Sequence, residues 1–314
     1  TWPNRSSSME NACSTSNLSR IGWLKTLEDL GYQARFIHRD HLLGGALERE
    51  GFKVLILNRA LCLSDAEAAA IQSFGRKGGL VLADHLTGLF DEHGKARGKG
   101  ALDDFFGVRH DLGKGILGGG TLTEVDAEKD QHFSEKSWAG ARGPLYKGMA
   151  VFERGLGSQG AGQGEMAQDI LVRVRSGPHV WFNVSPAGYL LKRATPGAQE
   201  WLAEIASHLK RAGLEPRLRI SLGGAPASVT ESIFWKNGNR MTLCVVQNLD
   251  RKAEIDSFGA TQGNLGEGAL KVKLSFAVEA KSLVNERTGR AMGDGKSFED
   301  DFTPWEANVY TYTP

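Results

Sequence analysis

The chain has 314 residues, of which 38 are Lys or Arg and 37 are Asp or Glu, so its formal net charge is +1. This length allows two domains that each bury a core. A near-neutral chain without a charged tail offers no basic face for nucleic acid, and no apolar run approaches the roughly 18 residues of a membrane span. We therefore expect neither nucleic acid nor a membrane among its partners.

The three cysteines, Cys13, Cys62 and Cys244, are far apart and odd in number. This argues against a disulfide framework and against a structural zinc site. The chain begins with Thr1 rather than Met, and no signal peptide is visible. We therefore expect a processed, truncated or excised piece of a longer protein. The compartment stays open, since a soluble cytoplasmic protein and a soluble secreted one both fit.

An apolar stripe predicts the first helix over about residues 18–30. Residues 34–37 are predicted to form a strand, and a short helix is predicted over about 40–50. No strand precedes the first helix, although a doubly wound domain normally begins with one. We expect that strand to lie upstream of Thr1 or to be degenerate.

The stretch from Gly51 to Gly94 has the clearest pattern. Residues 54–57 and 80–83 are unbroken apolar runs, typical of strands that are buried on both faces of a parallel sheet. Between them, Ser64-Asp65-Ala66-Glu67 matches a capping box, which predicts the start of a helix. The predicted buried stripe of that helix is Ala66, Ala70, Ile71 and Phe74. Strand, helix and strand predict one parallel βαβ unit with a right-handed crossover.

From residue 95 to about 164 the pattern weakens, and we expect irregular hairpins plus one short helix within 101–108. Residues 170–174 and 179–184 are predicted as strands joined near Gly177-Pro178. A clear helix is predicted to begin at Pro196, since proline is favoured at the first helical position.

Past Pro216 the pattern changes to β-branched and aromatic runs separated by turns, most clearly at Asn237-Gly238. The sequence therefore predicts an α/β domain over residues 1–216 and a small β-sandwich domain over 217–314. The predicted fold class of the first domain is a flavodoxin-like parallel sheet with helices on both faces. Trp181 and Trp235 lie in predicted strands and are expected in the cores.

The segment GFKVLILNRALCLSDAEAAAIQSFGRKGGLVLADHLTGLFDEHG, followed by LDDFFGV, resembles the trimerisation domain of glycoside hydrolase family 42 β-galactosidases. That domain has a class I glutamine-amidotransferase-like fold. The likeness continues with HVWFNVSPAGYLLKRATPGAQEWLAEIASHLKRAGLEP, which is similar to a closing strand and final helix in relatives of those enzymes. The C-terminal part, ending TPWEANVYTYTP, is similar to their small sandwich. The resemblance covers about residues 18–314.

In that family the chemistry belongs to a (β/α)8 barrel that precedes this region, where two glutamates act as acid/base and nucleophile. Retaining hydrolysis needs two carboxyls about 5–5.5 Å apart. The sequence has no eightfold βα pattern, and no Glu in it matches either catalytic residue. The resemblance thus implies a non-catalytic region without a cofactor that supports oligomerisation, with a trimer suggested, and borders the active site of a missing barrel. Carbohydrate would be bound through the parent enzyme.

A second hypothesis is a stand-alone carbohydrate-binding or sugar-utilisation module of amidotransferase-like fold, and a third is a structural surface protein. The ligand of such a module would lie at the loop 84–94, because open α/β sheets bind ligands at the carboxyl ends of their strands. The candidate residues of this loop are Asp84, His85, Asp91, Glu92 and His93. Their spacing matches no metal motif, so no metal is predicted, and a solvated or subunit-contact loop is the simpler interpretation. For Asp84 we expect a structural hydrogen-bonding role.

A glutamine amidotransferase needs a cysteine at a sharp turn after a buried strand, with a histidine partner. The second buried strand is followed by His85-Leu86-Thr87-Gly88, without a cysteine. We expect Cys62 and Cys244 to be packed as small hydrophobic residues.

Aromatic residues are frequent in the weakly patterned region: Phe105, Phe106, Phe133, Trp138, Tyr146 and Phe152. Trp138 and Tyr146 are candidates for stacking on a sugar ring. We expect some of this set to form an exposed apolar patch at a subunit contact. Phe105 and Phe106 have an alternative role as core anchors.

Overall fold

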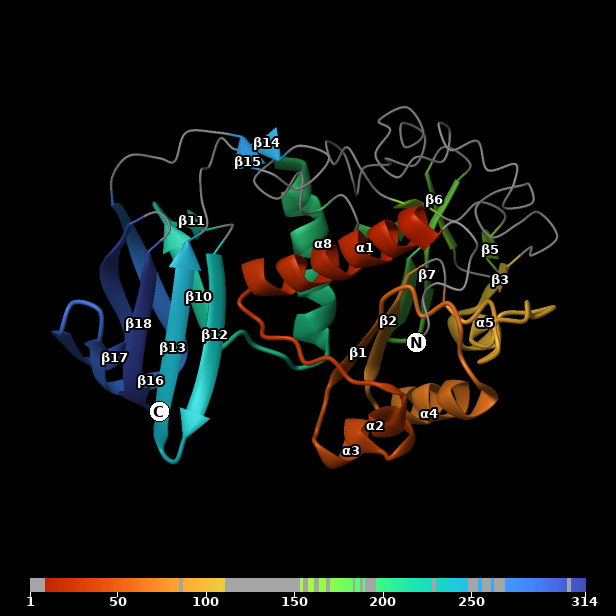
Figure 1. Ribbon diagram of the computed structural model, residues 1–314, viewed down its shortest axis with the longest axis horizontal. Coiled ribbons are helices and arrows are strands. Elements are labelled where there is room, and N and C mark those ends of the chain that lie inside the picture. The colour runs from red at the N-terminus through yellow and green to blue at the C-terminus, as the bar shows by residue number, and fades with distance from the viewer. Residues whose placement is uncertain are drawn as a thin grey trace. The chain divides into compact units, whose positions relative to one another are not determined.

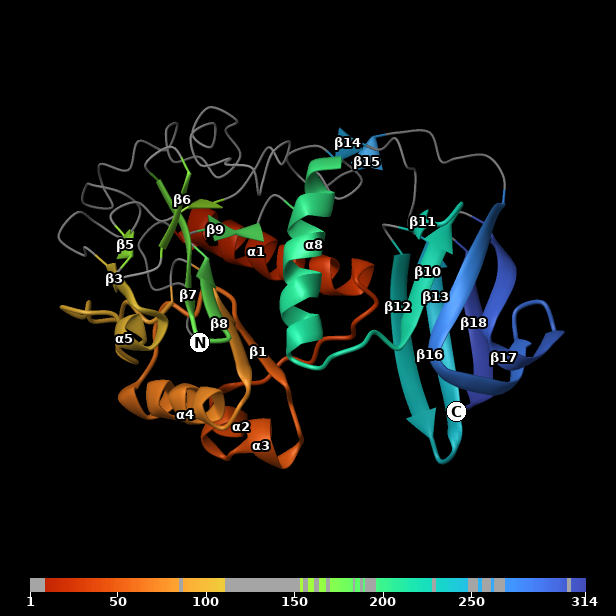
Figure 2. The ribbon, with the colours of Figure 1, turned by 180° about the vertical axis from the view of Figure 1, so that it is seen from behind.

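The computed structural model describes residues 9–84, 87–110, 153–154, 158–160, 164–167, 170–182, 184–186, 189, 196–227, 230–247, 254–255, 261–262, 269–303 and 306–314. The chain forms two compact units, shown from opposite sides in Figures 1 and 2. The first unit consists of Thr1–Trp23 and Phe36–Leu214, and the second of Leu24–Arg35 and Glu215–Pro314. Helix α1 (Met9–Asp29) therefore contributes to both units.

The segment after α1 differs from the prediction. Residues 32–38 contain no strand, and the side chain of Phe36 is 66% exposed, so the strand predicted over 34–37 is wrong. The short helix predicted over 40–50 is two helices, α2 (Arg39–Leu43) and α3 (Ala46–Arg49). They are separated at Gly45, whose φ of +70° is incompatible with a continuous right-handed helix.

The central βαβ unit is confirmed. Strand β1 (Val54–Leu57) pairs in parallel with β2 (Leu80–Ala83), and α4 (Asp65–Arg76) connects them. The predicted capping box is present at the start of α4. Ile71 and Phe74 are buried as predicted, whereas Ala66 is exposed and Ala68 is buried in its place.

The sheet of the first unit has the order β1-β2-β8-β7-β6. Strand β8 (His179–Phe182) is parallel to β2, whereas β7 (Ile170–Ser176) and β6 (Gly164–Ala167) run antiparallel to their neighbours. The predicted connection near Gly177-Pro178 is present, and β7 and β8 pair across it as an antiparallel hairpin. The first unit is therefore a mixed α/β structure around a sheet that contains parallel strands.

Smaller elements complete the first unit. Helix α5 (Asp103–Phe106) lies within the predicted 101–108, and α8 (Pro196–Arg211) begins at the predicted proline. Strand β3 (Val108–His110) pairs with β5 (Ser158–Gly160), and β4 (Glu153–Arg154) pairs with β9 (Val184–Ser185). Residues 111–152 of the region expected to form irregular hairpins lie outside the described residues.

Side chains of β8 alternate between the two faces of the sheet. Trp181 is fully buried, as predicted, in the cluster that contains Ile71 and Phe74 of α4. Its neighbour Phe182 packs instead against Trp23 of α1 and Trp201 of α8, with ring centroids 6.3 and 5.4 Å away. Helices thus cover both faces of the sheet.

Phe105 and Phe106 are core residues. Phe106 is 1% exposed, and Phe105 packs against the same cluster as Trp181 with its ring 4.5 Å from that of His179. The idea that these two residues belong to an exposed contact patch is therefore wrong, and their alternative role as core anchors is confirmed. Phe133 and Phe152 lie outside the described residues.

The second unit is built from strands that pair in one antiparallel sheet, in the order β11-β10-β16-β18-β13-β12, with β17 on β16. Its strands are β10 (Leu218–Leu222), β11 (Ala225–Pro226), β12 (Thr230–Asn237), β13 (Arg240–Gln247), β16 (Leu270–Asn285), β17 (Arg290–Phe302) and β18 (Ala307–Thr313). A separate pair is formed by β14 (Glu254–Ile255) and β15 (Thr261–Gln262).

The sheet of the second unit curls along β16. The first half of β16 pairs with β10 and the second half pairs with β18, with register shifts between Ser275 and Val284. Such irregularities bend a strand and increase its twist. Leu243, Leu274 and Tyr310 are among the fully buried side chains of its core. Trp235, expected in a core, is instead 51% exposed on β12.

Candidate functional site

The carboxyl ends of β1 and β2 meet at the place where the sequence predicts a ligand loop. Leu57 is the register partner of Ala83, so the next residues, Asn58 and Arg59 on one strand and Asp84 on the other, come together. The backbone N–H of Asp84 donates to the carbonyl of Leu57 at 3.3 Å. Asp84 is fully buried and Arg59 is 6% exposed. We call this group of residues the strand-end cluster.

The carboxylate of Asp84 holds the backbone of the strand-end cluster in place. Its Oδ2 accepts a hydrogen bond from the backbone N–H of Arg59 at 2.6 Å, and the Thr87 hydroxyl donates to the Asp84 carbonyl at 3.0 Å. Arg59 has φ +43°, a left-handed conformation that costs a non-glycine residue about 1 kcal/mol or more. This is the structural hydrogen-bonding role expected for Asp84.

Helix α1 also reaches the strand-end cluster. The hydroxyl of Ser19, which is fully buried, donates to Oδ1 of Asn58. The sequence analysis missed this contact, whose two partners lie 39 residues apart in the chain. No local pattern could have found it.

Asp91 and Glu92 do not join Asp84. Oδ1 of Asp91 accepts the backbone N–H groups of Lys95 and His93, both at 2.9 Å. The bond from Lys95 is the main cause that lowers the pKa of Asp91. Glu92 is exposed and forms a long ion pair with His93, at 3.9 Å. The Asp91 carboxylate therefore closes its own turn, and His85 lies outside the described residues.

Arg97 connects this loop to the start of α4. Its Nη2 donates to the Leu63 carbonyl at 2.8 Å, and its Nη1 lies 2.8 Å from Oδ1 of Asp65. Next to this contact the capping box is closed by Ser64 and Glu67, with N–O distances of 2.9 and 3.2 Å. The loop is thus fastened to the central βαβ unit, and Arg97 is a residue that the sequence analysis did not single out.

The chemistry available here is limited. The position after β2, where an amidotransferase would carry its nucleophile, holds the engaged carboxylate of Asp84. Cys62 is half-buried and forms a backbone bridge with Phe90, and Cys244 is half-buried on β13, where burial raises the pKa of its thiol. Within the described parts of the chain, no three His, Cys, Asp or Glu side chains group as metal ligands would. Trp138 and Tyr146 lie outside those parts.

A second group of charged side chains lies between β7 and α8, and its members Glu204, Arg173 and His208 are largely buried. Glu204 lies 2.6 Å from Nη1 of Arg173, 2.6 Å from Nε2 of His208 and 3.5 Å from Nη2 of Arg175. Arg211 donates to Nδ1 of His208 at 2.5 Å, so the proton on Nε2 points at Glu204. We call these five residues the Glu204 cluster. A sequence signal existed, since Glu204 and His208 are spaced i,i+4 on a predicted helix.

The neighbouring side chains change the pKa of Glu204. Burial by itself would raise the pKa, but the hydrogen bond from His208 and the charge of Arg173 outweigh it and lower the pKa from 4.5 to about 2. The carboxylate is therefore ionised in the folded protein at every ordinary pH. Its partners are all cationic or donating groups of the same unit, which is a structural arrangement.

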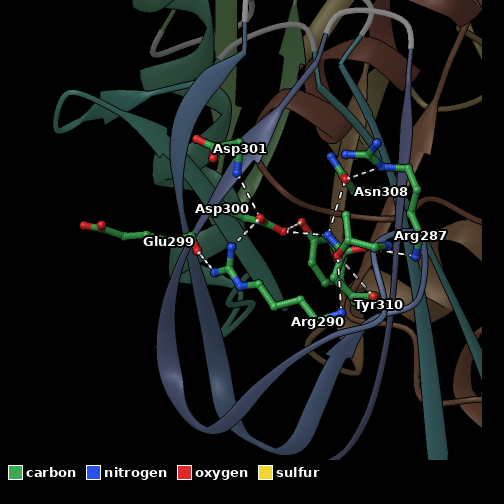
Figure 3. A network of polar contacts seen from close by, with 9 residues as sticks. Arg287, Arg290, Glu299, Asp300, Asp301, Asn308 and Tyr310 are labelled. Carbon is green, nitrogen blue, oxygen red and sulfur yellow. Dashed lines mark hydrogen bonds and ion pairs between the residues drawn. The ribbon is translucent and has the colours of Figure 1, made fainter.

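The second unit contains a third polar group around Asp300, shown in Figure 3. Oδ2 of Asp300 accepts hydrogen bonds from the Tyr310 hydroxyl and from Nδ2 of Asn285, both at 2.8 Å. Oδ1 accepts from Arg290 Nη1 at 3.3 Å and from the Asp301 N–H at 2.9 Å. Burial, followed by the bond to Asp300, raises the pKa of Tyr310 far above its usual range. We call this the Asp300 network.

The Asp300 network ties the β16–β17 turn to the sheet. Oδ1 of Asn285 accepts the N–H groups of Arg287 and Thr288 at 3.1 and 3.3 Å, and Nε of Arg287 donates to Oδ1 of Asn308 at 3.0 Å. Both oxygens of Asp300 are occupied by protein donors. The network therefore fixes the fold of the second unit and leaves its carboxylate no open position for a substrate.

The comparisons with known proteins rest on structure. Neither a family model nor a curated protein matches this sequence. The fold is similar to that of a β-galactosidase from Bacillus circulans sp. alkalophilus, with 14% identity and a TM-score of 0.56 over 94% of this chain and 37% of that one. A catalytic mutant of a GH42 β-galactosidase from G. stearothermophilus gives 12% identity and a TM-score of 0.56, over 99% of this chain and 38% of that one.

Two further solved structures agree in fold. A cold-adapted β-galactosidase from Rahnella sp. R3 gives 9% identity and a TM-score of 0.55, over 94% of this chain and 36% of that one. Isoenzyme 2 of α-L-fucosidase from Paenibacillus thiaminolyticus gives 12% identity and a TM-score of 0.50, over 94% and 45%. The chain thus has the fold of part of these β-galactosidases and spans a little over a third of their length. Of the helices that the structure describes, none has the length and apolar character needed to cross a bilayer.

The Glu204 cluster makes stability depend on pH. A folded-state pKa of about 2 against 4.5 corresponds to about 3 kcal/mol of stabilisation, fully present above pH 4.5 and lost as the pH falls toward 2. We expect Glu204→Gln to lower the free energy of unfolding by about 3 kcal/mol at pH 7, because it leaves Arg173 buried without a counter-charge. The difference from the unsubstituted chain should shrink below pH 4.5.

Urea denaturation at pH 7, 5 and 3.5 measures this difference. The matched control is Glu215→Gln, whose exposed ion pair with Arg219 should contribute less than about 1 kcal/mol at each pH. A penalty for Glu204→Gln that is the same at all three pH values would contradict the proposed linkage.

The Asp300 network predicts that Tyr310→Phe destabilises the second unit by about 1.5–3 kcal/mol, because a hydrogen bond to a buried carboxylate is lost. Tyr312→Phe is the control, since Tyr312 is equally buried but its hydroxyl has no hydrogen bond within the described residues. Hydrogen exchange of the β16 and β18 amides should quicken in the first variant only. Equal effects of the two substitutions would show that burial, not the network, is what matters.

Proposed function

We propose that this chain is the non-catalytic C-terminal region of a β-galactosidase-like glycoside hydrolase. In this proposal the first unit corresponds to the amidotransferase-like, flavodoxin-like trimerisation domain, and the second to the C-terminal β-sandwich. The observation that carries the proposal is coverage: similarity extends over 94–99% of this chain but over only 36–38% of the GH42 β-galactosidases. The remaining length of those proteins leaves room for a catalytic domain outside the part that this chain matches.

The contacts of the buried carboxylates favour a structural role for this chain over a catalytic one. Asp84, Glu204 and Asp300 each accept hydrogen bonds or ion pairs from their own unit. A retaining glycosidase needs two carboxyls about 5–5.5 Å apart that face the substrate bond. We infer that the sugar chemistry of the parent protein takes place on a preceding (β/α)8 barrel, which the first unit borders and helps to assemble.

A stand-alone sugar-binding module with its ligand at the loop 84–94 is the alternative. It has less support, because the carboxylates of Asp84 and Asp91 are used to hold the loop itself. The coding sequence upstream of Thr1 separates the two proposals. A (β/α)8 barrel there supports the first, whereas a start codon or a signal peptide alone supports the second.

We expect the purified chain to have no glycosidase activity, since the carboxylates described above are engaged in structure. Nitrophenyl galactosides, glucosides and arabinosides are suitable substrates, and the parent protein is the positive control. Turnover by the chain alone that a single Glu→Gln substitution within it abolishes would refute the proposal.

We also propose that the first unit forms subunit contacts in the parent protein. The resemblance implies that the assembly is a trimer. Among the described residues of the first unit, Phe36 and Leu43 expose large apolar side chains, at 66% and 40%. Exposed apolar side chains are common at subunit contacts. Light scattering of the parent protein at micromolar concentration should give the mass of a closed homo-oligomer, and Phe36→Ser with Leu43→Ser should reduce it.

Val278→Ser is the control for this experiment, because Val278 is 53% exposed on the second unit. It should leave the mass unchanged. A parent protein that is monomeric without any substitution would rule out the oligomeric role.

A further inference from the structure

One exposed face of the second unit has a chemical character that the proposed function does not use. Trp235 on β12 is 51% exposed, and it has no ring or hydrogen-bond partner among the described residues. Tryptophan buries a large apolar area when it packs, so this exposed indole offers a flat apolar surface to a ligand. The strands β12, β13 and β18 that form this face are labelled in Figure 1.

Strand register places hydroxyl side chains beside Trp235. Trp235 is the partner of Thr242 on β13, and Thr242 is the partner of Thr311 on β18. Register partners on neighbouring strands project from the same face of a sheet, about 4.8 Å apart. The three side chains therefore form one row, about 10 Å from end to end, with the indole at the edge.

The row ends at two charged side chains, those of Arg240 and Glu286. Nη2 of Arg240 donates to the Thr311 hydroxyl at 2.6 Å and lies 3.4 Å from Oε1 of Glu286. The Thr311 hydroxyl donates to the same carboxylate. Arg240 is 61% exposed and Glu286 is 43% exposed, so both keep hydrogen-bonding capacity toward solvent.

The exposed side chains of this face indicate which class of ligand it can bind. The exposed large apolar side chains described on β12 are Trp235 and Ile233, which lies two residues earlier on the same face and is 45% exposed. Beside them the row continues with hydroxyls, a guanidinium and a carboxylate, which are groups that form hydrogen bonds to sugar hydroxyls. A sugar ring offers an apolar C–H face together with equatorial hydroxyls that both donate and accept. Trp235 matches the apolar face, and the Thr311–Arg240–Glu286 end matches the hydroxyls of the next ring.

We propose that Trp235, Thr242, Thr311, Arg240 and Glu286 form a saccharide-binding platform for an oligosaccharide of at least two pyranose rings. One ring stacks on the indole, and the next lies over the threonine row and bonds to the charged pair. The platform belongs to the second unit alone. It does not depend on the proposed function, because a chain without a catalytic barrel would still carry it.

The test uses the full chain and two probes, β-1,4-linked galactotetraose and cellotetraose, with galactose for comparison. Isothermal titration calorimetry should detect binding of at least one tetrasaccharide at millimolar or lower concentration, and weaker binding of galactose. Trp235→Ala should weaken binding by about tenfold or more. Arg240→Ala should also weaken it, while Val278→Ala, an exposed apolar change elsewhere on the second unit, should not.

Circular dichroism establishes that each variant is folded, which the exposure of Trp235 and Arg240 favours. Two outcomes would overturn the proposal. One is that neither tetrasaccharide binds at about 10 mM. The other is that Trp235→Ala leaves saccharide binding unchanged, and a changed sedimentation of that variant would then assign this face to a protein contact. Absence of glycosidase activity bears only on the proposed function and leaves this test intact.

Discussion

The backbone hydrogen bonds between β1 and β2 bring Arg59 beside Asp84, although 25 residues separate them in the chain. That pairing buries a carboxylate at the end of the sheet, and the carboxylate in turn holds Arg59 in a left-handed conformation. Ser19 then anchors α1 to the adjacent Asn58. Because each contact depends on the preceding one, the place where α/β proteins usually bind ligands is here occupied by the protein's own polar groups.

The parts of the fold that follow local rules could be predicted from the sequence. Two apolar runs and a capping box predict the βαβ unit, and a proline at its first position predicts the start of α8. The structural role of Asp84 was also predictable, because a carboxylate directly after a buried strand must find donors. The donor to its carboxylate was not, since the backbone N–H of Arg59 is selected by tertiary pairing and not by sequence spacing.

Other predictions failed where a non-local partner decides the outcome. Residues 34–37 have the composition of a strand, but β1 pairs only with β2 among the described strands, and Phe36 is left exposed. Alternation along β12 shows that Phe234 and Trp235 face opposite sides, yet it does not tell which side is the core. The curl of the sheet buries Phe234 and leaves Trp235 in solvent. The Glu204 cluster likewise needs β7 and α8 to be in place.

The second unit is discontinuous in the chain, and this affects how it is made. The ammonium group of Lys25 pairs with Glu231, which lies 206 residues later, and Gln33 accepts the outward N–H of Phe234 on the edge strand β12. During synthesis the segment 24–35 leaves the ribosome long before the strands that it serves. The edge of β12 is therefore completed only after the whole of the first unit has been translated. A version of the second unit cut at Glu215 would present that strand edge unprotected, as a template for association with other chains.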